Sequence, residues 1–186
     1  MDAPAHAPDP DAEAVLLRRA RRGDGAAFEA LYHDHARAVH ALAFRLTGNA
    51  AEAEDIVQET FLRMFGFLSG LRENTPLRPW LKRVAANLAI DRLRRQQRPG
   101  TDMALAALAD PASASPADAA DADTLLRRLP PLARTVVWLH EMEGWSHEDL
   151  GRRFGRTASW SKSLMSRSLA RLRQDLDPHG DAPHDV

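Results

Sequence analysis

Residues 99–123 divide this chain of 186 residues into two parts. The segment holds five Asp and three Pro but no Lys or Arg, and it begins with Pro99 and Gly100, a pair that ends helices. We interpret residues 99–122 as a flexible acidic linker. The linker predicts two small domains, residues 13–98 and 123–176, with disordered ends at residues 1–12 and 177–186.

Apolar residues recur at helical spacing on both sides of this linker. Val and Ile together number only nine, whereas Ala, Leu and Arg are abundant, which favours helix over strand. The chain has no Cys, which excludes disulfides and Cys-ligated zinc. We therefore predict an all-α fold of two small helical domains.

Helix ends in the first domain are marked by short signals. Asp24 can cap a helix that runs towards Thr47, and Asn49 with Glu52 has the spacing of a capping box for a helix over 49–68. The Gly- and Pro-containing stretch at 69–79 predicts a loop. A further helix is expected from residue 80 to about 97.

The net charge of −1 conceals a strong segregation of charge. Residues 78–98 hold seven basic side chains against Asp91 alone, and residues 152–173 hold seven with no acid. The remainder of the chain has 11 basic (25 less 14) and 25 acidic (26 less 1) residues. A solvated helix face usually carries mixed signs, so the two basic blocks indicate surfaces that bind a polyanion.

The second basic block has the pattern of a helix-turn-helix. Ser146 can cap a short helix to Phe154, Gly155 can supply the turn, and Thr157 can cap a longer helix to Leu176. An apolar stripe is expected on the longer helix at Ala158, Met165, Leu169, Leu172 and Leu176. The opposite side suits a major groove, and its candidate DNA-binding residues are Ser159, Trp160, Lys162, Ser163, Ser166, Arg167 and Arg171.

The first basic block, WLKRVAANLAIDRLRRQQR, predicts a helix with a basic ridge between two apolar stripes. Four ridge residues fall within a sector of about 60° at 100° per residue. Asn can read a base edge and Arg can hold phosphates, which predicts contact with DNA. The candidate DNA-binding residues of this helix are Lys82, Arg83, Asn87, Arg94 and Arg98.

Both blocks resemble a known family. FEALYHDHARAVHALAFRLTGNAAEAEDIVQETFLRMF followed by WLKRVAANLAIDRLRRQQR resembles region 2 of the extracytoplasmic-function (ECF) group of sigma-70 factors. LPPLARTVVWLHEMEGWSHEDLGRRFG with its following helix resembles region 4. The resemblance covers roughly residues 13–98 and 121–175. It implies a bacterial transcription-initiation subunit that binds core RNA polymerase and directs it to −35 and −10 promoter elements.

The resemblance also implies roles for particular segments. Region 4 would contact the flap of the second polymerase subunit, and the acidic linker would thread the polymerase's nucleic-acid channel. Region 2 would capture an unstacked base of the non-template strand in the 69–78 loop, with Asn87 lining the site. The helix 49–68 would dock on the clamp helices of the largest polymerase subunit through Glu52, Asp55, Gln58, Glu59 and Leu62.

One stretch departs from the family pattern. Members usually carry Gly-Thr-Val-Lys-Ser-Arg at the start of the recognition helix, and here Ser159–Leu164 reads Ser-Trp-Ser-Lys-Ser-Leu. Trp160 and Leu164 form an apolar pair on the expected DNA side. Three interpretations stay open: contact with thymine methyl groups, packing against a neighbouring helix, or burial against a protein partner such as an anti-sigma factor.

Several other functions are disfavoured. An alternative is a sigma-like mimic that sequesters an anti-sigma factor, but such a protein has no use for a basic recognition helix. The spacing of His33, His35 and His40 does not place their side chains on one metal-chelating face of a helix. The sequence has no nucleophile–His–acid set and no phosphate-binding loop. We therefore expect neither an enzyme nor a cofactor. The N-terminus lacks a signal peptide, and no apolar run reaches the roughly 18 residues of a membrane helix. We expect a cytoplasmic protein that does not insert into a membrane and that is inhibited by an anti-sigma factor.

Overall fold

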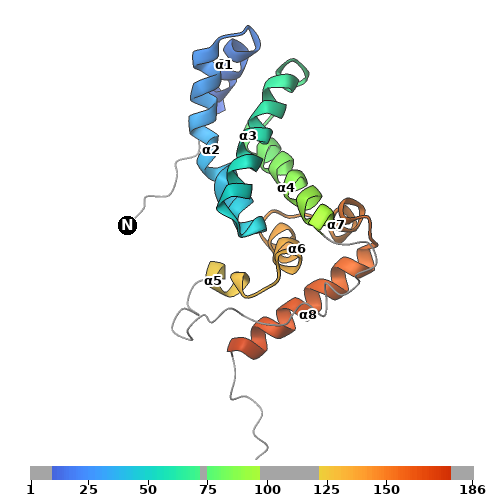
Figure 1. The fold of residues 1–186 in the computed structure, drawn as a ribbon. Coiled ribbons are helices and arrows are strands. Elements are labelled where there is room, and N and C mark those ends of the chain that lie inside the picture. The colour runs from blue at the N-terminus through green and yellow to red at the C-terminus, as the bar shows by residue number, and fades with distance from the viewer. Residues whose placement is uncertain (1–9, 72–74, 97–121, 177–186) are drawn as a thin grey trace, which may run out of the picture. The chain divides into compact units, whose positions relative to one another are not determined.

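The computed structural model describes residues 10–71, 75–96 and 122–176 (Figure 1). Every regular element within these ranges is a helix, which confirms the all-α prediction. The elements before the predicted linker are α1 (Pro10–Arg21), α2 (Gly25–Thr47), α3 (Ala50–Phe67), the short 3-10 helix η1 (Leu68–Gly70) and α4 (Leu77–Gln96). Those after it are α5 (Ala122–Arg127), α6 (Pro131–Glu141), α7 (His147–Phe154) and α8 (Ala158–Leu176).

The helices form two compact units. The first unit contains Met1–Phe44 and Asn49–Leu88, and the second contains Arg45–Gly48 and Ala89–Val186. Most of the predicted linker lies outside the described residues, so the predicted domain boundaries at 99 and 122 stay predictions. Among the residues that the structure describes, no helix combines the length and the apolar character that a membrane crossing requires.

Helix starts in the first unit follow the predicted caps. Asp24 accepts a hydrogen bond from the backbone N–H of Ala27 at 3.2 Å, and Asn49 accepts one from the N–H of Glu52 at 3.2 Å. Each cap satisfies one of the N–H groups that have no partner within the helix. α1 begins at Pro10, three residues before the predicted domain start at residue 13. Proline fits the first helical position, where its missing N–H costs nothing.

The predicted loop over 69–79 is wrong at both ends. Leu68–Gly70 forms η1, and α4 already begins at Leu77. Pro79 therefore lies in the first turn of α4, where its missing N–H and fixed φ are tolerated. The start of α4 is further fixed by Glu13 of α1, whose carboxylate accepts a hydrogen bond from the Leu77 N–H at 3.2 Å. That contact joins residues 64 positions apart in the sequence, so no local sequence pattern predicts it.

The core of the first unit joins one stripe from each helix. Leu17 of α1, Leu31 of α2, Ile56 of α3 and Leu81 of α4 are each at most 2% exposed. Burial of a large aliphatic side chain contributes roughly 1.5–3 kcal/mol, so such positions dominate the stability of the unit. His35 is also buried within this unit, and its Nε2 lies 2.9 Å from Oε2 of Glu13.

In the second unit, α6, α7 and α8 enclose a small core that includes Leu139, Leu150 and Phe154. The helix-turn-helix is present as predicted. Ser146 caps α7 by accepting a hydrogen bond from the Asp149 N–H at 3.0 Å, and Gly155 ends it with a φ of 67°. That left-handed conformation suits glycine because it has no Cβ.

Gly151 brings α7 and the start of α8 unusually close together. A Cβ placed on Gly151 would lie 2.7 Å from the carbonyl carbon of Thr157, 2.8 Å from its oxygen and 2.9 Å from the nitrogen of Ala158. Thr157 in turn caps α8, with its Oγ1 accepting from the Trp160 N–H at 3.2 Å. The direction of α8 is therefore set by backbone packing as well as by its side chains.

Candidate DNA and polymerase interfaces

The outer face of α8 carries most of the predicted DNA-binding side chains. Ser159, Lys162, Ser163, Ser166 and Arg167 are all exposed. Arg167 Nε donates to the carbonyl of Ser163 at 3.1 Å, one turn earlier on the same helix. No acidic side chain occurs between residues 144 and 174 apart from the two near the start of α7. The exposed face of α8 is thus positive and rich in hydrogen-bond donors.

Trp160 and Arg171 are half-buried rather than exposed. The Trp160 ring packs against Phe154 with ring centroids 5.3 Å apart, and Leu164 is only 4% exposed. Of the three interpretations of this apolar pair, the contacts favour packing against a neighbouring helix. For Leu164, which was expected on the DNA side, the prediction is wrong.

The inner face of α8 is rotated relative to the predicted stripe. The predicted residue Leu176 is 51% exposed and Leu169 is half-buried, whereas Ser161 and Ser168 are buried. Ser168 donates to the carbonyl of Leu164 at 2.8 Å, which satisfies its hydroxyl inside its own helix. The buried residues of α8 are Ser161, Leu164, Met165, Ser168 and Leu172. Small serines allow close helix packing, and a search for large apolar residues overlooks them.

A histidine pair lies at the junction of α6, α7 and α8. The rings of His140 and His147 stack with centroids 4.1 Å apart, and His147 Nδ1 lies 3.1 Å from Oγ of Ser161. Burial lowers the pKa of His147, and the positive potentials of His140 and Lys162 lower it further. The neutral form of His147 is thereby favoured, and it can share a hydrogen bond with the Ser161 hydroxyl.

The predicted ridge of α4 lies on the helix surface. Arg83 and Arg94 are exposed, and Lys82 and Asn87 are half-buried. Arg98, the fifth predicted residue, lies outside the described residues. The remaining predicted side chains therefore share one helix, with two of the guanidinium groups at its surface.

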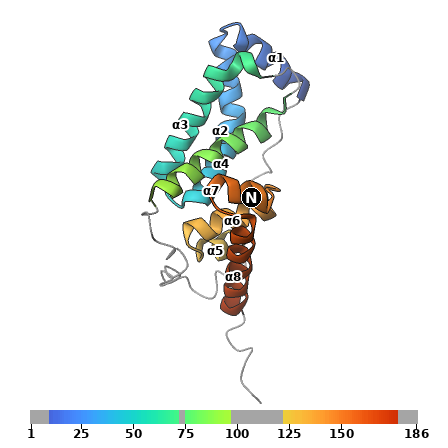
Figure 2. The same ribbon diagram turned by 90° about the vertical axis from the view of Figure 1, so that its right-hand side faces the viewer.

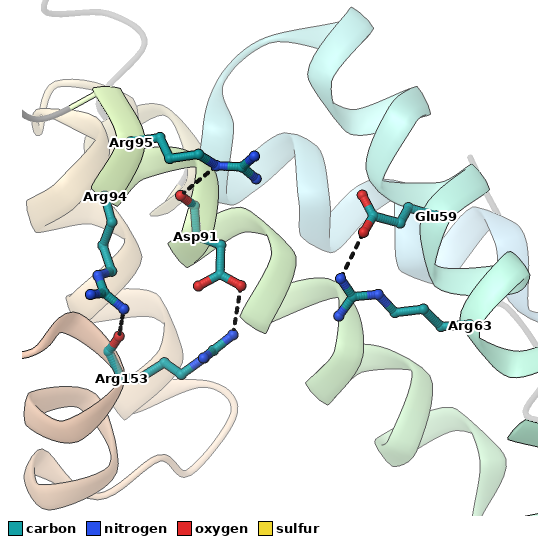
Figure 3. A network of polar contacts seen from close by, with 6 residues as sticks. All are labelled: Glu59, Arg63, Asp91, Arg94, Arg95 and Arg153. Atoms are coloured by element: carbon teal, nitrogen blue, oxygen red, sulfur yellow. Dashed lines mark hydrogen bonds and ion pairs between the residues drawn. The ribbon is translucent and has the colours of Figure 1, made fainter.

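The end of α4 carries a small polar network inside the second unit (Figure 3). Arg153 of α7 pairs with the Asp91 carboxylate at 2.8 Å, and Arg94 donates to the backbone carbonyl of Arg153 at 3.2 Å. Arg95 donates to the carbonyl of Asp91 at 3.2 Å, one turn earlier. Such partly exposed pairs contribute about 0–1 kcal/mol, so a phosphate can compete for these guanidinium groups.

The predicted polymerase-binding residues lie on one side of α3. Asp55, Gln58 and Leu62 are exposed, while Glu52 and Glu59 are half-buried. Glu59 accepts a hydrogen bond from Arg63 at 2.7 Å, which holds its carboxylate at the surface (Figure 3). The flank is therefore acidic at its beginning and apolar towards its end.

Phe65 has the helical spacing of a core residue of α3, but it lies at the surface. It is 63% exposed, although the edge of its ring contacts Phe28 with centroids 5.4 Å apart. Leu62 nearby is 70% exposed. Phe67 is 51% exposed, but its ring stacks on that of Trp80 with centroids 6.2 Å apart. Leu62 and Phe65 lie one helical turn apart on one side of α3, and together they indicate an apolar surface that another macromolecule covers. Leu62 was predicted at this surface, whereas the helical spacing of Phe65 resembles that of a core residue, so the sequence did not identify Phe65 as part of it.

Comparison with known proteins identifies the family. The Sigma-70 region 2 family matches residues 31–99, and the Sigma-70, region 4 family matches residues 120–172. The chain is 35% identical over 168 residues to RNA polymerase sigma factor CarQ of Myxococcus xanthus, covering 86% of this chain and 95% of CarQ.

A second sigma factor and a solved structure are also similar to this chain. The chain is 34% identical over 173 residues to ECF RNA polymerase sigma factor SigE of Mycolicibacterium smegmatis, covering 84% of this chain and only 65% of SigE. The solved structure of CnrH in complex with the cytosolic domain of CnrY matches with a TM-score of 0.52 and 25% identity, covering 91% of this chain and 100% of that chain. The helical regions, their order and these relatives agree: the chain belongs to the ECF group of the sigma-70 family of RNA polymerase sigma factors.

Proposed function

We propose that this protein binds core RNA polymerase and directs it to promoters, acting as an initiation factor and not as an enzyme. The observation that supports this most is the outer face of α8. Its exposed Lys162, Arg167 and three serines form a donor-rich surface without an acid, and the tight turn between α7 and α8 fixes its direction. A helix of this kind can enter the major groove of a −35 element.

The ridge of α4 supplies the second DNA contact in this proposal. Arg83 and Arg94 would hold phosphates of the −10 element, and Asn87 would contact a base that has left the stack. Extrusion of a base costs a few kcal/mol, so the surface that receives it must be fixed before DNA arrives. Charged contacts with phosphates also make the complex sensitive to salt.

α3 would dock on polymerase through its flank. Asp55 and Gln58 offer exposed polar groups, and Leu62 offers an exposed apolar one beside Phe65. A surface with an apolar centre and a charged border is typical of a protein interface. We assign it to the clamp helices of the largest subunit, and we assign the region around α6–α8 to the flap of the second subunit.

Control by an anti-sigma factor completes the proposal. CnrH was solved in complex with the cytosolic domain of CnrY. A protein that covers the basic faces of α4 and α8, or the apolar end of α3, would block DNA or polymerase. The protein would then be kept inactive in the cytoplasm, where both polymerase and promoter DNA are found.

Transcription from purified components tests the function. A promoter is first selected from a randomised −35 and −10 library with the wild-type protein and core polymerase. Arg167→Ala is expected to reduce use of the −35 element with unchanged polymerase binding, and Arg83→Ala to reduce promoter opening. The logarithm of the affinity falls linearly with the logarithm of the salt concentration, and each lost phosphate contact makes this slope less steep by about 0.9. Arg22→Ala removes an exposed charge of the same kind from the turn that follows α1 and serves as the matched control.

The outcomes separate the alternatives. A transcript from the selected promoter that falls in both variants but not in the control supports the proposal. Stable polymerase binding with no transcript from any promoter would instead favour the sigma-like mimic. If Arg167→Ala abolishes polymerase binding, the assignment of α8 to DNA is wrong.

A further inference from the structure

α1 makes polar contacts with the backbone at the end of α3. Nε of Arg21 donates to the carbonyl of Leu68 at 3.0 Å, and its Nη2 donates to the carbonyl of Leu71. Carbonyls at the end of a helix have no partner in the helix and carry partial negative charge. A guanidinium satisfies two of them at once with charge-assisted hydrogen bonds. The backbone of η1 is thereby fastened to α1.

The same helix also fastens the start of α4. Oε1 of Glu13 accepts a hydrogen bond from the N–H of Leu77, the first residue of α4, at 3.2 Å. Its Oε2 lies 2.9 Å from Nε2 of His35, a side chain of α2 that is only 1% exposed. Glu13 thus acts as an N-terminal cap supplied by another helix, and His35 restricts the position of its carboxylate.

These two contacts lie on opposite sides of the connection between α3 and α4. Glu13 and Arg21 are eight residues apart, about 12 Å along the helix axis. α1 runs beside η1 and crosses the end of the unit where α3 finishes and α4 begins (Figure 2). All of the residues involved belong to the first unit. One rigid helix therefore holds both Leu71 and Leu77.

We propose that α1 is a brace for promoter opening, in which Arg21 and Glu13 are positioning residues that fix η1 and the start of α4. The inference rests on the proposed function, because α4 carries the ridge assigned to the −10 element. A helix anchored at its first residue presents Arg83 and Asn87 in a constant direction. Both positioning residues precede residue 31, where the match to the Sigma-70 region 2 family begins. The brace therefore lies outside the segment that this family matches.

Amide hydrogen exchange tests the brace without DNA. Because Leu77 is the first residue of α4, its N–H has no partner within the helix, so its protection depends on Glu13. Glu13→Ala is expected to raise the exchange rate of this amide by about tenfold or more. Glu13→Gln keeps an acceptor oxygen and should retain the protection. Unchanged exchange at Leu77 in Glu13→Ala would overturn the proposed contact.

Initiation on two templates tests the role of the brace. One template is the selected duplex promoter, and the other has the same sequence with the −10 region already unpaired. Arg21→Ala and Glu13→Ala are expected to lose about tenfold in initiation on the duplex, equivalent to about 1.4 kcal/mol in the barrier. Initiation on the unpaired template should stay within twofold of the wild type. Arg18→Ala, an exposed arginine on the same helix, is the matched control.

The results distinguish the brace from a general loss of structure. Equal losses on both templates, with weaker polymerase binding, would show that α1 only stabilises the fold and would overturn the brace. Duplex initiation within twofold of wild type in both variants would overturn it as well. If the wild-type protein starts transcription on neither template, the proposed function itself fails, whereas the exchange at Leu77 still reports on the contact.

Discussion

Gly151→Ala offers a direct test of how the helix-turn-helix is held together. The added methyl group would lie 2.7–2.9 Å from three backbone atoms of Thr157 and Ala158. Favourable contacts between carbon atoms occur at about 3.5–4.0 Å, so the start of α8 would have to move by roughly 0.7 Å or more. Backbone cannot rotate away as the tip of a long side chain can, and α8 must therefore shift as a body.

The expected magnitude follows from two opposing terms. Overpacking of this kind costs about 1–3 kcal/mol, whereas replacing glycine by alanine inside a helix gains about 1 kcal/mol. Three simultaneous short contacts place the cost in the upper part of its range. We therefore expect Gly151→Ala to lower the free energy of unfolding by about 1–2 kcal/mol. The displaced α8 should also bind the −35 element more weakly.

Gly66→Ala is the matched control. Gly66 lies in α3, and a Cβ placed on it would meet nothing within 4 Å. This substitution should leave stability unchanged or raise it by up to about 1 kcal/mol. Urea unfolding followed by circular dichroism and tryptophan fluorescence measures both variants. The reasoning is refuted if Gly151→Ala proves as stable as the wild type or gains stability as Gly66→Ala does.

Three further predictions concern pH, a helix cap and the polymerase surface. Burial lowers the pKa of His35 below its ordinary value of 6.5 despite the opposing effect of Glu13. The unfolded chain therefore binds a proton that the folded chain does not, and unfolding titrations should show stability falling as pH drops below about 6.5 towards the folded pKa. Ser146→Ala removes the acceptor for the Asp149 N–H and should cost about 1 kcal/mol, measured by urea unfolding. Leu62→Ser should change stability by less than about 0.5 kcal/mol because the side chain is 70% exposed, yet it should weaken polymerase binding in a pull-down titration. A normal affinity in that variant would remove Leu62 from the proposed interface.

Features determined by neighbouring residues could be predicted from the sequence. Asn49 and Ser146 cap helices through N–H groups three residues ahead, and Gly155 supplies the left-handed turn. These interactions lie within one turn of chain, so residue type and spacing suffice to identify them. The division into acidic and basic segments was equally visible, because charge is a property of composition.

Features determined by distant residues could not be predicted. The start of α4 depends on Glu13, which is remote in the sequence. Because Pro79 was assigned to a loop, the helix was predicted to begin at residue 80, three residues after its observed start at Leu77. The inner face of α8 was misplaced because Ser161 and Ser168 replace the large apolar residues that mark a buried stripe. Phe65 has the spacing of a core residue, yet it is 63% exposed, because periodicity does not encode how far the neighbouring helices cover a given position.

The two faces of α8 are separable, and this has a consequence for how such a protein can change. Folding depends on the buried positions of α8 and the proposed contact with DNA on the exposed ones, so a substitution at an exposed position leaves the buried ones intact. Promoter preference could therefore diverge, or be redesigned, by exchanging a handful of outward side chains while the scaffold retains its stability. The positions open to such exchange are Ser159, Lys162, Ser163, Ser166 and Arg167.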